Sequence, residues 1–312
     1  MIDFAFVFPG QGSQSVGMLD AFGDHPAVVA TIAEASQALG EDVGRLIREG
    51  PKEQLDLTAN TQPVMLTADI ACWRAWLAEG GARPAAVAGH SLGEYAALVA
   101  AGALSLADAV PLVRLRALAM QDAVPVGSGA MAAILGLDAQ QVRDGCATAA
   151  AETGEVVEAV NFNDPKQTVI AGSKAGVEAA CTVLKGLGAK RALPLPVSAP
   201  FHCSLMRPAA ERLRERLAAV PLATPSIRVV NNIDVQSPSD PAAIRDALYR
   251  QAFGPVRWVE VVQSLRGSGI RHFIECGPGK ALSGMVKRID ADALTGSVAD
   301  PASLALTKEM LS

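Results

Sequence analysis

A serine between two glycines is the part of this chain best suited to covalent chemistry. Residues 89–93 read Gly-His-Ser-Leu-Gly, after an apolar stretch over 85–88 and before an alanine-rich helical run over 94–101. That order of strand, sharp turn and helix is the context in which a G-x-S-x-G pentapeptide forms a nucleophile elbow. The Oγ of the serine is then exposed at a helix N-terminus, where developing negative charge is stabilised. We predict that Ser91 is a catalytic nucleophile, and the alternative is an ordinary glycine-rich turn.

A serine nucleophile is weak without a base, and the chain has only four histidines. His90 adjoins the serine on a turn where neighbouring side chains point apart, so it is a poor base. His25 and His272 have the contexts of a surface residue and a strand residue. His202 lies in a proline-stiffened loop directly after Phe201, which can shield the imidazole from water. We therefore favour His202 as the base over a structural histidine, and no acidic partner stands out.

A pair of arginines, Arg114 and Arg116, lies on a predicted helix downstream of the elbow. Residues two apart on a helix face different directions, so one can be exposed while the other reaches a cleft. A buried arginine presents a planar fork that binds a carboxylate through two hydrogen bonds. Two solvated arginines are the alternative.

The elements that position these residues follow an α/β pattern. Apolar runs predict buried strands over 4–8 and 85–89, and helical patterns fill most of 26–80. After the inserted segment described next, the pattern predicts helices over 208–219, 241–253 and 259–267 and strands over 227–231 and 272–275. A turn at 277–279 then leads into a final helix.

Residues 127–197 differ in character from the rest. Their expected order is strand, helix, strand, strand, helix, strand, which is the ferredoxin-like βαββαβ pattern. The six segments are 131–135, 139–151, 156–160, 167–171, 174–187 and 192–197. We therefore expect a larger α/β domain formed by residues 1–126 and 198–312, with a small domain, residues 127–197, inserted into it.

The composition narrows the class of protein. Half of the 312 residues are hydrophobic, which is enough to bury a substantial core, and the net charge of -5 argues against a nucleic-acid protein. No apolar run approaches the length of a membrane span. The N-terminus lacks the basic start of a signal peptide, so we expect a cytoplasmic protein. The five cysteines are odd in number and form no C-x-x-C, which argues against a disulfide framework or a structural zinc site.

Together these segments resemble the bacterial malonyl-CoA:acyl-carrier-protein transacylases of fatty acid synthesis, and the match runs nearly end to end. The fold that this resemblance implies is an α/β-hydrolase-like core with an inserted ferredoxin-like small domain. The segments that carry the resemblance are 4–14, 89–95, 129–134, 160–163, 230–234, 250–251, 255–258 and 275–280.

The resemblance implies a Ser–His dyad rather than a full triad. Ser91 matches the acylated nucleophile and His202 its base, and the main-chain carbonyl of Gln251 orients the histidine. In the same family, backbone N–H groups at the positions of Gln11 and Leu92 form the oxyanion hole.

The resemblance also assigns residues to the acyl group. Arg116, and not Arg114, matches the arginine that holds the malonyl carboxylate. Asn161 and Phe201 match supporting positions, and Phe201 with the following histidine resembles the Phe-His pair of malonyl-selective acyltransferase domains.

The implied reaction is a ping-pong transfer of malonyl from malonyl-CoA to the phosphopantetheine thiol of acyl carrier protein. It requires no metal or redox cofactor, and coenzyme A is a product. One alternative is a near relative, either the malonyl transferase component of malonate decarboxylase or a stand-alone polyketide acyltransferase. The others are a serine thioesterase or esterase and an inactive carrier-protein-binding module.

Overall fold

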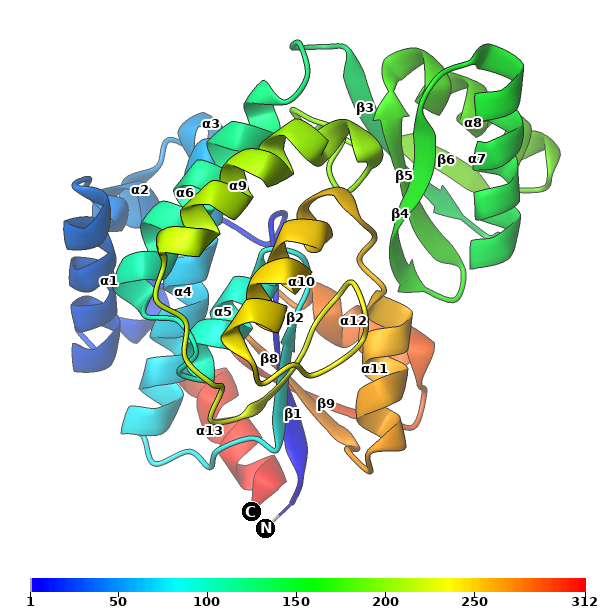
Figure 1. Cartoon of the computed structure of the whole chain (residues 1–312). Coiled ribbons are helices and arrows are strands. Elements are labelled where there is room, and N and C mark those ends of the chain that lie inside the picture. Colours follow the sequence, from blue (N-terminus) through cyan, green and yellow to red (C-terminus); the bar gives the residue numbers. More distant parts are fainter. Residues whose placement is uncertain (1) are drawn as a thin grey trace.

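Two sheets of different kinds organise the computed structural model, which describes residues 2–312 (Figure 1). The larger sheet has five parallel strands in the order β7-β2-β1-β8-β9. The strands are β1 (Phe4–Phe8), β2 (Ala86–Gly89), β7 (Arg228–Val230), β8 (His272–Cys276) and β9 (Leu294–Val298). All residues of the central strand β1 are buried, because helices cover both faces of the sheet.

The side chains of β1 alternate between two hydrophobic clusters, as the period of a strand requires. Phe4, Phe6 and Phe8 point into the larger cluster, whereas Ala5 and Val7 pack on the other face of the sheet. Helices of the larger cluster are α1 (Pro26–Leu39), α2 (Val43–Glu49), α3 (Lys52–Leu55), α4 (Thr58–Ala78), α5 (Gly93–Ala100), α6 (Leu106–Asp122), α9 (Arg207–Ala219), α10 (Pro241–Phe253) and α13 (Pro301–Leu311). Helices α11 (Trp258–Gly267) and α12 (Ala281–Ile289) cover the opposite face.

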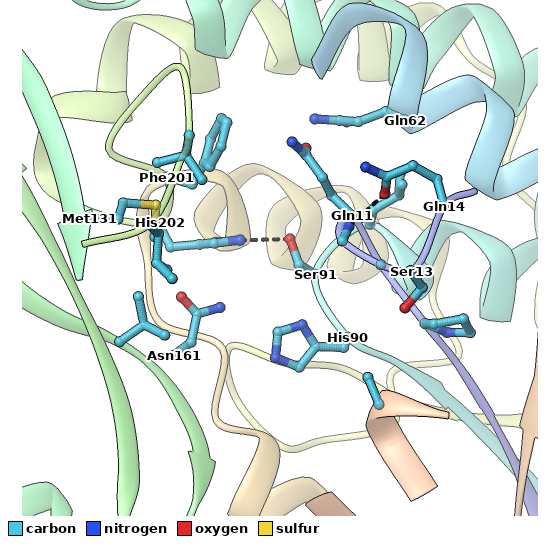
Figure 2. Close-up of a pocket in the computed structure, with 18 of the residues that line it drawn as sticks. Gln11, Ser13, Gln14, Gln62, His90, Ser91, Met131, Asn161, Phe201 and His202 are labelled. Carbon is cyan, nitrogen blue, oxygen red and sulfur yellow. Dashed lines mark hydrogen bonds between the residues drawn. The ribbon is translucent and has the colours of Figure 1, made fainter. Parts of the chain in front are cut away.

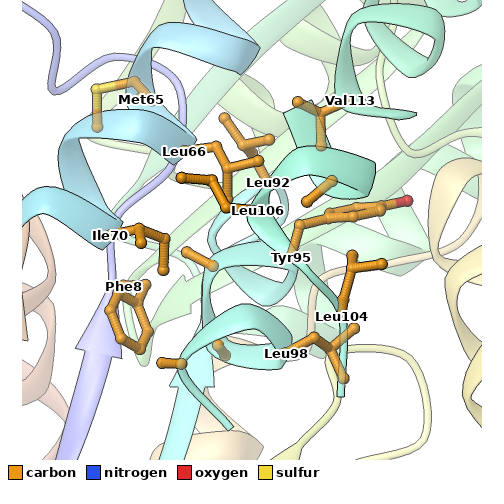
Figure 3. Packing of buried hydrophobic residues seen from close by; sticks show 14 of the residues in the cluster. Phe8, Met65, Leu66, Ile70, Leu92, Tyr95, Leu98, Leu104, Leu106 and Val113 are labelled. Atoms are coloured by element: carbon orange, nitrogen blue, oxygen red, sulfur yellow. The ribbon is translucent and has the colours of Figure 1, made fainter. Parts of the chain in front are cut away.

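Helix α5, which begins directly after the serine elbow, is buried along its length except at Val99. It lies between α4 and α6, where Leu66 and Val113 pack around it together with its own Tyr95 and Leu98 (Figure 3). A helix buried on all sides has no solvent to satisfy a polar side chain. Any charge that α5 carries must therefore find its partners inside the protein.

The smaller sheet is antiparallel, with the strand order β4-β5-β3-β6. It consists of β3 (Gly129–Leu135), β4 (Val157–Asp164), β5 (Gln167–Ser173) and β6 (Arg191–Pro194). Helices α7 (Ala139–Thr153) and α8 (Lys174–Gly186) pack on one of its faces. This is the ferredoxin-like βαββαβ arrangement, so the expected fold class is confirmed.

Strand β4 attaches the small sheet to the rest of the chain. Backbone hydrogen bonds join Val256 N–H to Val160 O (2.8 Å) and Phe162 N–H to Val256 O (2.9 Å). An ion pair between Arg288 of α12 and Asp164 (2.6 Å) closes the same junction. The face of the small sheet opposite α7 and α8 is thereby held next to the carboxyl ends of the parallel strands, with residues of the 195–205 segment packed against it.

The C-terminal part differs from the expectation. The helix predicted after the turn at 277–279 is α12, but it is not the final element, because strand β9 and helix α13 follow it. Strand β9 is an edge strand of mixed burial, so it lacks the continuous apolar run that identified β1.

The last strand of the small sheet is shorter than expected. The strand predicted over 192–197 ends at Pro194, because proline residues lack the N–H donors that a strand ladder needs. Among the helices of residues 2–312, none is both long and apolar enough to cross a membrane.

Candidate active site

The turn between β2 and α5 holds Ser91 in a left-handed conformation, with φ of 52°. A Cβ added to Gly89 would overlap the backbone of Gly93, and one added to Gly93 would overlap the carbonyl of Phe8 on β1. Only glycine permits this approach of strand, turn and helix. The N–H of Ser91 donates to Oδ1 of Asn232 at 2.7 Å, which fixes the turn from the side of β7. The predicted elbow is therefore present, with its serine facing a cavity (Figure 2).

His202 faces Ser91 across this cavity, and its Nε2 lies 2.6 Å from the Ser91 Oγ (Figure 2). The Nδ1 of the imidazole lies 2.9 Å from the main-chain oxygen of Gln251. Because a carbonyl oxygen can only accept, Nδ1 carries the proton and Nε2 is left as an acceptor for the serine hydroxyl. His202 also has a positive φ, 67°, so both members of the pair occupy a backbone region that non-glycine residues rarely adopt.

The electrostatic environment keeps this imidazole neutral. Burial lowers the pKa of His202 to about 3, and the positive charge of Arg116 lowers it further, against the raising effect of the Gln251 carbonyl. A neutral imidazole is the form that accepts a proton. The pair is therefore in the protonation state that serine activation needs throughout the neutral pH range.

Arg116 is the buried arginine, and it projects from α6 toward the same serine. Its Nη1 donates to Oε1 of Gln62 at 2.8 Å, and its Nη2 donates to the Ser91 Oγ and to Oε1 of Gln251, each at 3.2 Å. Its Nε is buried and has no partner. Arg114 instead points to the surface, where it pairs with Glu41 at 2.7 Å.

The loop after β1 brings a second set of backbone donors to the serine. Within residues 2–312, neither the N–H of Gln11 nor that of Leu92 donates to a protein acceptor. Both residues line the cavity next to Ser91. The side chain of Gln11 is turned away and donates to Oγ1 of Thr58 at 3.1 Å. Two free N–H groups beside a nucleophile are the components of an oxyanion hole.

The cavity has a volume of about 820 Å³, which is within the usual range for small-molecule sites. Phe201 and Asn161 line it on the side of the small sheet, and the buried Oδ1 of Asn161 has no partner. His90 also lines the cavity, but its Nε2 is bound to Oδ1 of Asn163 at 2.8 Å rather than to the serine. Burial lowers the pKa of His90 as well.

Among the polar residues that contact the site, Gln62, Glu94 and Asn232 were not predicted. Glu94 did carry a signal, because a lone acid in an alanine-rich helix breaks the hydrophobic pattern. Asn232 follows β7 at the carboxyl end of a parallel strand, where sites of α/β sheets form. Gln62 lies on a long helix and no spacing marks it. In the described part of the chain, no cluster of three or more His, Cys, Asp or Glu side chains is arranged to hold a metal ion.

A serine on a strand–helix elbow, a neutral histidine against its hydroxyl and free N–H groups beside it form the kind of site that serine enzymes use to make acyl intermediates. Comparison with known proteins narrows this class. Residues 5–300 match the family model described as an acyl transferase domain.

The relatives of the chain agree with that match. Malonyl CoA-acyl carrier protein transacylase of Salmonella typhimurium is 53% identical over 306 residues, which cover 97% of this chain and 98% of the relative. The crystal structure of acyl-carrier-protein S-malonyltransferase from Burkholderia pseudomallei is 65% identical, with a TM-score of 0.97 over 99% of this chain and 100% of that one. A malonyl-transacylase solved in complex with a type II PKS acyl-carrier protein is 48% identical, with a TM-score of 0.96 over 99% of each chain. The chain belongs to the malonyl CoA-acyl carrier protein transacylases of the acyl transferase family.

The packing of the elbow predicts that Gly93→Ala destabilises the protein. The added methyl group meets the backbone of β1, so strand and helix must separate, and such overpacking costs about 1–3 kcal/mol or more. Gly186→Ala is the matched control, because a Cβ there meets nothing within 4 Å. Urea unfolding of both variants measures the difference. Equal unfolding free energies in the two variants would contradict the close approach.

The environment of His202 predicts a pH-dependent contribution to stability. Its pKa is depressed in the native protein, so between pH 6.5 and about 3 the unfolded chain binds a proton that native His202 does not. Acidification therefore destabilises the wild type by about 1.4 kcal/mol for each pH unit through this residue. We expect wild type to lose stability relative to His202→Gln as the pH falls from 6.5, measured by denaturant unfolding at several pH values. A pH-independent difference between the two would show that His202 titrates normally.

Proposed function

We propose that this enzyme transfers a malonyl group from malonyl-CoA to the phosphopantetheine thiol of an acyl carrier protein, through a malonyl ester of Ser91, in fatty acid synthesis. One observation carries the proposal: a buried arginine donates to the same serine hydroxyl that contacts a neutral histidine. The pair suits acyl transfer in general, and the arginine suits an acyl group that ends in a carboxylate.

In the first half-reaction, the Ser91 Oγ attacks the thioester carbonyl while Nε2 of His202 takes the hydroxyl proton. The N–H groups of Gln11 and Leu92 stabilise the oxyanion that forms. The carbon–sulfur bond then breaks, and coenzyme A leaves with the proton from His202. The short distance between Nε2 and Oγ supports this proton transfer.

In the second half-reaction, His202 takes the proton of the phosphopantetheine thiol, and the sulfur attacks the ester carbonyl of malonyl-Ser91. Collapse of the second tetrahedral intermediate breaks the ester bond, and the proton returns to the Ser91 Oγ. Nδ1 of His202 stays bound to the Gln251 carbonyl in both half-reactions, so the ring keeps one orientation. The cycle needs no metal or redox group.

Arg116 selects the acyl group in this proposal. Malonyl differs from acetyl by one carboxylate, and an apolar pocket separates two such groups weakly. A buried guanidinium whose Nε lacks a partner binds the carboxylate and is left unsatisfied by acetyl. Phe201 and Asn161 line the same cavity as supporting residues.

A serine thioesterase is the main rival from another reaction class. Such an enzyme is expected to orient its histidine with an acidic side chain, whereas Nδ1 of His202 meets a main-chain oxygen. A polyketide carrier protein is the alternative acceptor, and the related transacylase solved with a type II PKS acyl-carrier protein makes it worth testing. A malonyl transferase component of malonate decarboxylase is a further alternative, and it would accept the same malonyl group. Assays with different acceptors separate the thioesterase, the polyketide acyltransferase and this component, because each passes the acyl group to a different acceptor.

The domain limits and the location of the enzyme belong to the same proposal. The small domain comprises residues 127–197 and the core residues 1–126 and 198–312, which is supported by an antiparallel sheet that spans 129–194. The cysteines are all free and four of the five are buried, as is usual in the reducing cytoplasm.

Covalent catalysis at Ser91 predicts a malonyl adduct on the intact protein after mixing with malonyl-CoA. Ser91→Ala should form no adduct and lose several orders of magnitude in transfer rate. Ser128→Ala, which removes an exposed hydroxyl, is the control and should form the adduct normally. Mass spectrometry before and after addition of fatty acid or polyketide carrier protein follows both half-reactions. Rapid loss of the adduct to water without any thiol would favour the thioesterase instead.

The position of Arg116 predicts that Arg116→Ala loses malonyl transfer steeply while acetyl transfer is unchanged or improved. Removal of one partner of a buried charge pair costs about 2–5 kcal/mol. Arg116→Lys should recover only part of the loss, because an ammonium cannot reproduce the guanidinium fork. Arg114→Ala is the control on the same helix, and its malonyl-to-acetyl ratio of kcat/KM should stay close to wild type. If Arg116→Ala leaves that ratio unchanged, another group binds the carboxylate.

A further inference from the structure

Glu94 is a buried acid that the proposed reaction does not use. It lies in the first turn of α5, three residues after the nucleophile, and is only 2% exposed. One of its carboxylate oxygens, Oε2, accepts two hydrogen bonds, from the Gln251 side chain at 3.0 Å and from the Asn232 N–H at 2.8 Å. Both of these residues contact the catalytic groups, so the acid lies directly behind the site.

The first of these hydrogen bonds determines which way the Gln251 amide points. Its Nε2 donates to Glu94 and to the main-chain oxygen of Ser91, at 3.0 Å each. Its Oε1 is then the end that faces Arg116. If the amide were reversed, its NH₂ would face the guanidinium and its oxygen would face a carboxylate, so both contacts would be repulsive. Glu94 therefore fixes the orientation in which Gln251 accepts from Arg116.

The second hydrogen bond supports the elbow. The Asn232 side chain accepts from the Ser91 N–H and donates to the Gly89 carbonyl, at 2.7 Å each. Its backbone N–H is held by Glu94. Oε2 of Glu94 thus links Gln251, which contacts Arg116, to Asn232, which supports the turn that carries Ser91.

The charges of Glu94 and Arg116 also affect each other across the Gln251 amide. Burial raises the pKa of Glu94 to about 7, against the lowering effects of its hydrogen bonds and of the nearby Arg116. A buried arginine and a buried acid one amide apart offset part of each other's desolvation penalty. The amide between them keeps the guanidinium from pairing directly with Glu94, so Nη2 still reaches the Ser91 Oγ.

We propose that Glu94 is a positioning residue for acyl-group selection: as an acceptor at Oε2, it orients Gln251, and through Gln251 it holds Arg116 beside Ser91. This inference rests on the proposed function, because it assigns Arg116 to the malonyl carboxylate. It concerns the same reaction and adds a residue that touches neither the substrate nor the reacting atoms.

Three substitutions separate the acceptor of Glu94 from its charge. Glu94→Gln keeps an acceptor oxygen at the same reach but removes the charge. Glu94→Asp keeps the charge but withdraws the acceptor by one methylene. Glu94→Met fills similar space with neither. Because the proposal depends on the acceptor, Glu94→Gln should retain malonyl selectivity, and the other two should lose it.

The measurement is kcat/KM for acylation by malonyl-CoA and by acetyl-CoA, followed by intact-protein mass spectrometry. In Glu94→Asp and Glu94→Met, we expect malonyl acylation to fall about 10- to 100-fold, as for a misplaced site group, and acetyl acylation to fall much less. Glu94→Gln should keep a malonyl-to-acetyl ratio near that of wild type. In an Arg116→Ala background, Glu94→Asp should add little further loss of malonyl acylation, because the two residues act through one contact.

Two outcomes would overturn the inference. Equal losses of malonyl and acetyl acylation in Glu94→Asp would reduce Glu94 to a support of the elbow. A Glu94→Gln variant as unselective as Glu94→Asp would show that an acceptor oxygen without the negative charge does not hold Arg116 in place, which contradicts the proposal. Thermal unfolding checks that each variant is folded, and Glu94→Asp serves if Glu94→Met does not fold. If the wild type itself forms no malonyl adduct, the proposed function fails; if it does and both Glu94→Asp and Glu94→Met keep the wild-type selectivity, only this inference fails.

Discussion

The buried guanidinium of Arg116 is the constraint on which the rest of the site depends. Within residues 2–312 it forms no ion pair with a carboxylate at close range, and two glutamine oxygens accept from it instead. An amide oxygen satisfies a donor but does not neutralise its charge. The site therefore holds a cation that is hydrogen-bonded yet still electrostatically available. A direct carboxylate partner would have occupied the guanidinium fork that the proposed ligand requires.

The same charge contributes to the protonation state of His202. Burial lowers the pKa of this imidazole, and the positive group beside it disfavours a second positive charge, so the ring is held neutral. The main-chain carbonyl of Gln251 orients the imidazole of His202 and fixes its tautomer, and it does so without adding a negative charge next to the guanidinium. The histidine and the arginine thus share Gln251, one through its backbone oxygen and the other through its side chain.

Much of this arrangement could be predicted from the sequence, because it depends on local patterns. The elbow is marked by two glycines that only a close strand–helix approach requires, and the small sheet by alternating strand and helix periods. His202 could be predicted as the base because the chain has only four histidines. The amides could not be found in this way. Gln62, Gln251 and Asn232 come from separate parts of the chain that meet only in the folded protein, and an amide has no characteristic spacing; Gln251 was reached through family resemblance alone. Strand β9 was missed because an edge strand of mixed burial has no continuous apolar run.

The attachment of the small sheet to the core at β4 affects how the sequence of the cavity wall can vary between related proteins. The small sheet contributes Met131, Val169 and Asn161 to one wall of the cavity, whereas Ser91 and Arg116 come from elements packed around the parallel sheet. Because backbone hydrogen bonds and an ion pair fasten that wall to the core, its side chains can vary while its position stays fixed. The shape of this cavity can therefore diverge between proteins of this fold without any change in the strained turn that carries Ser91.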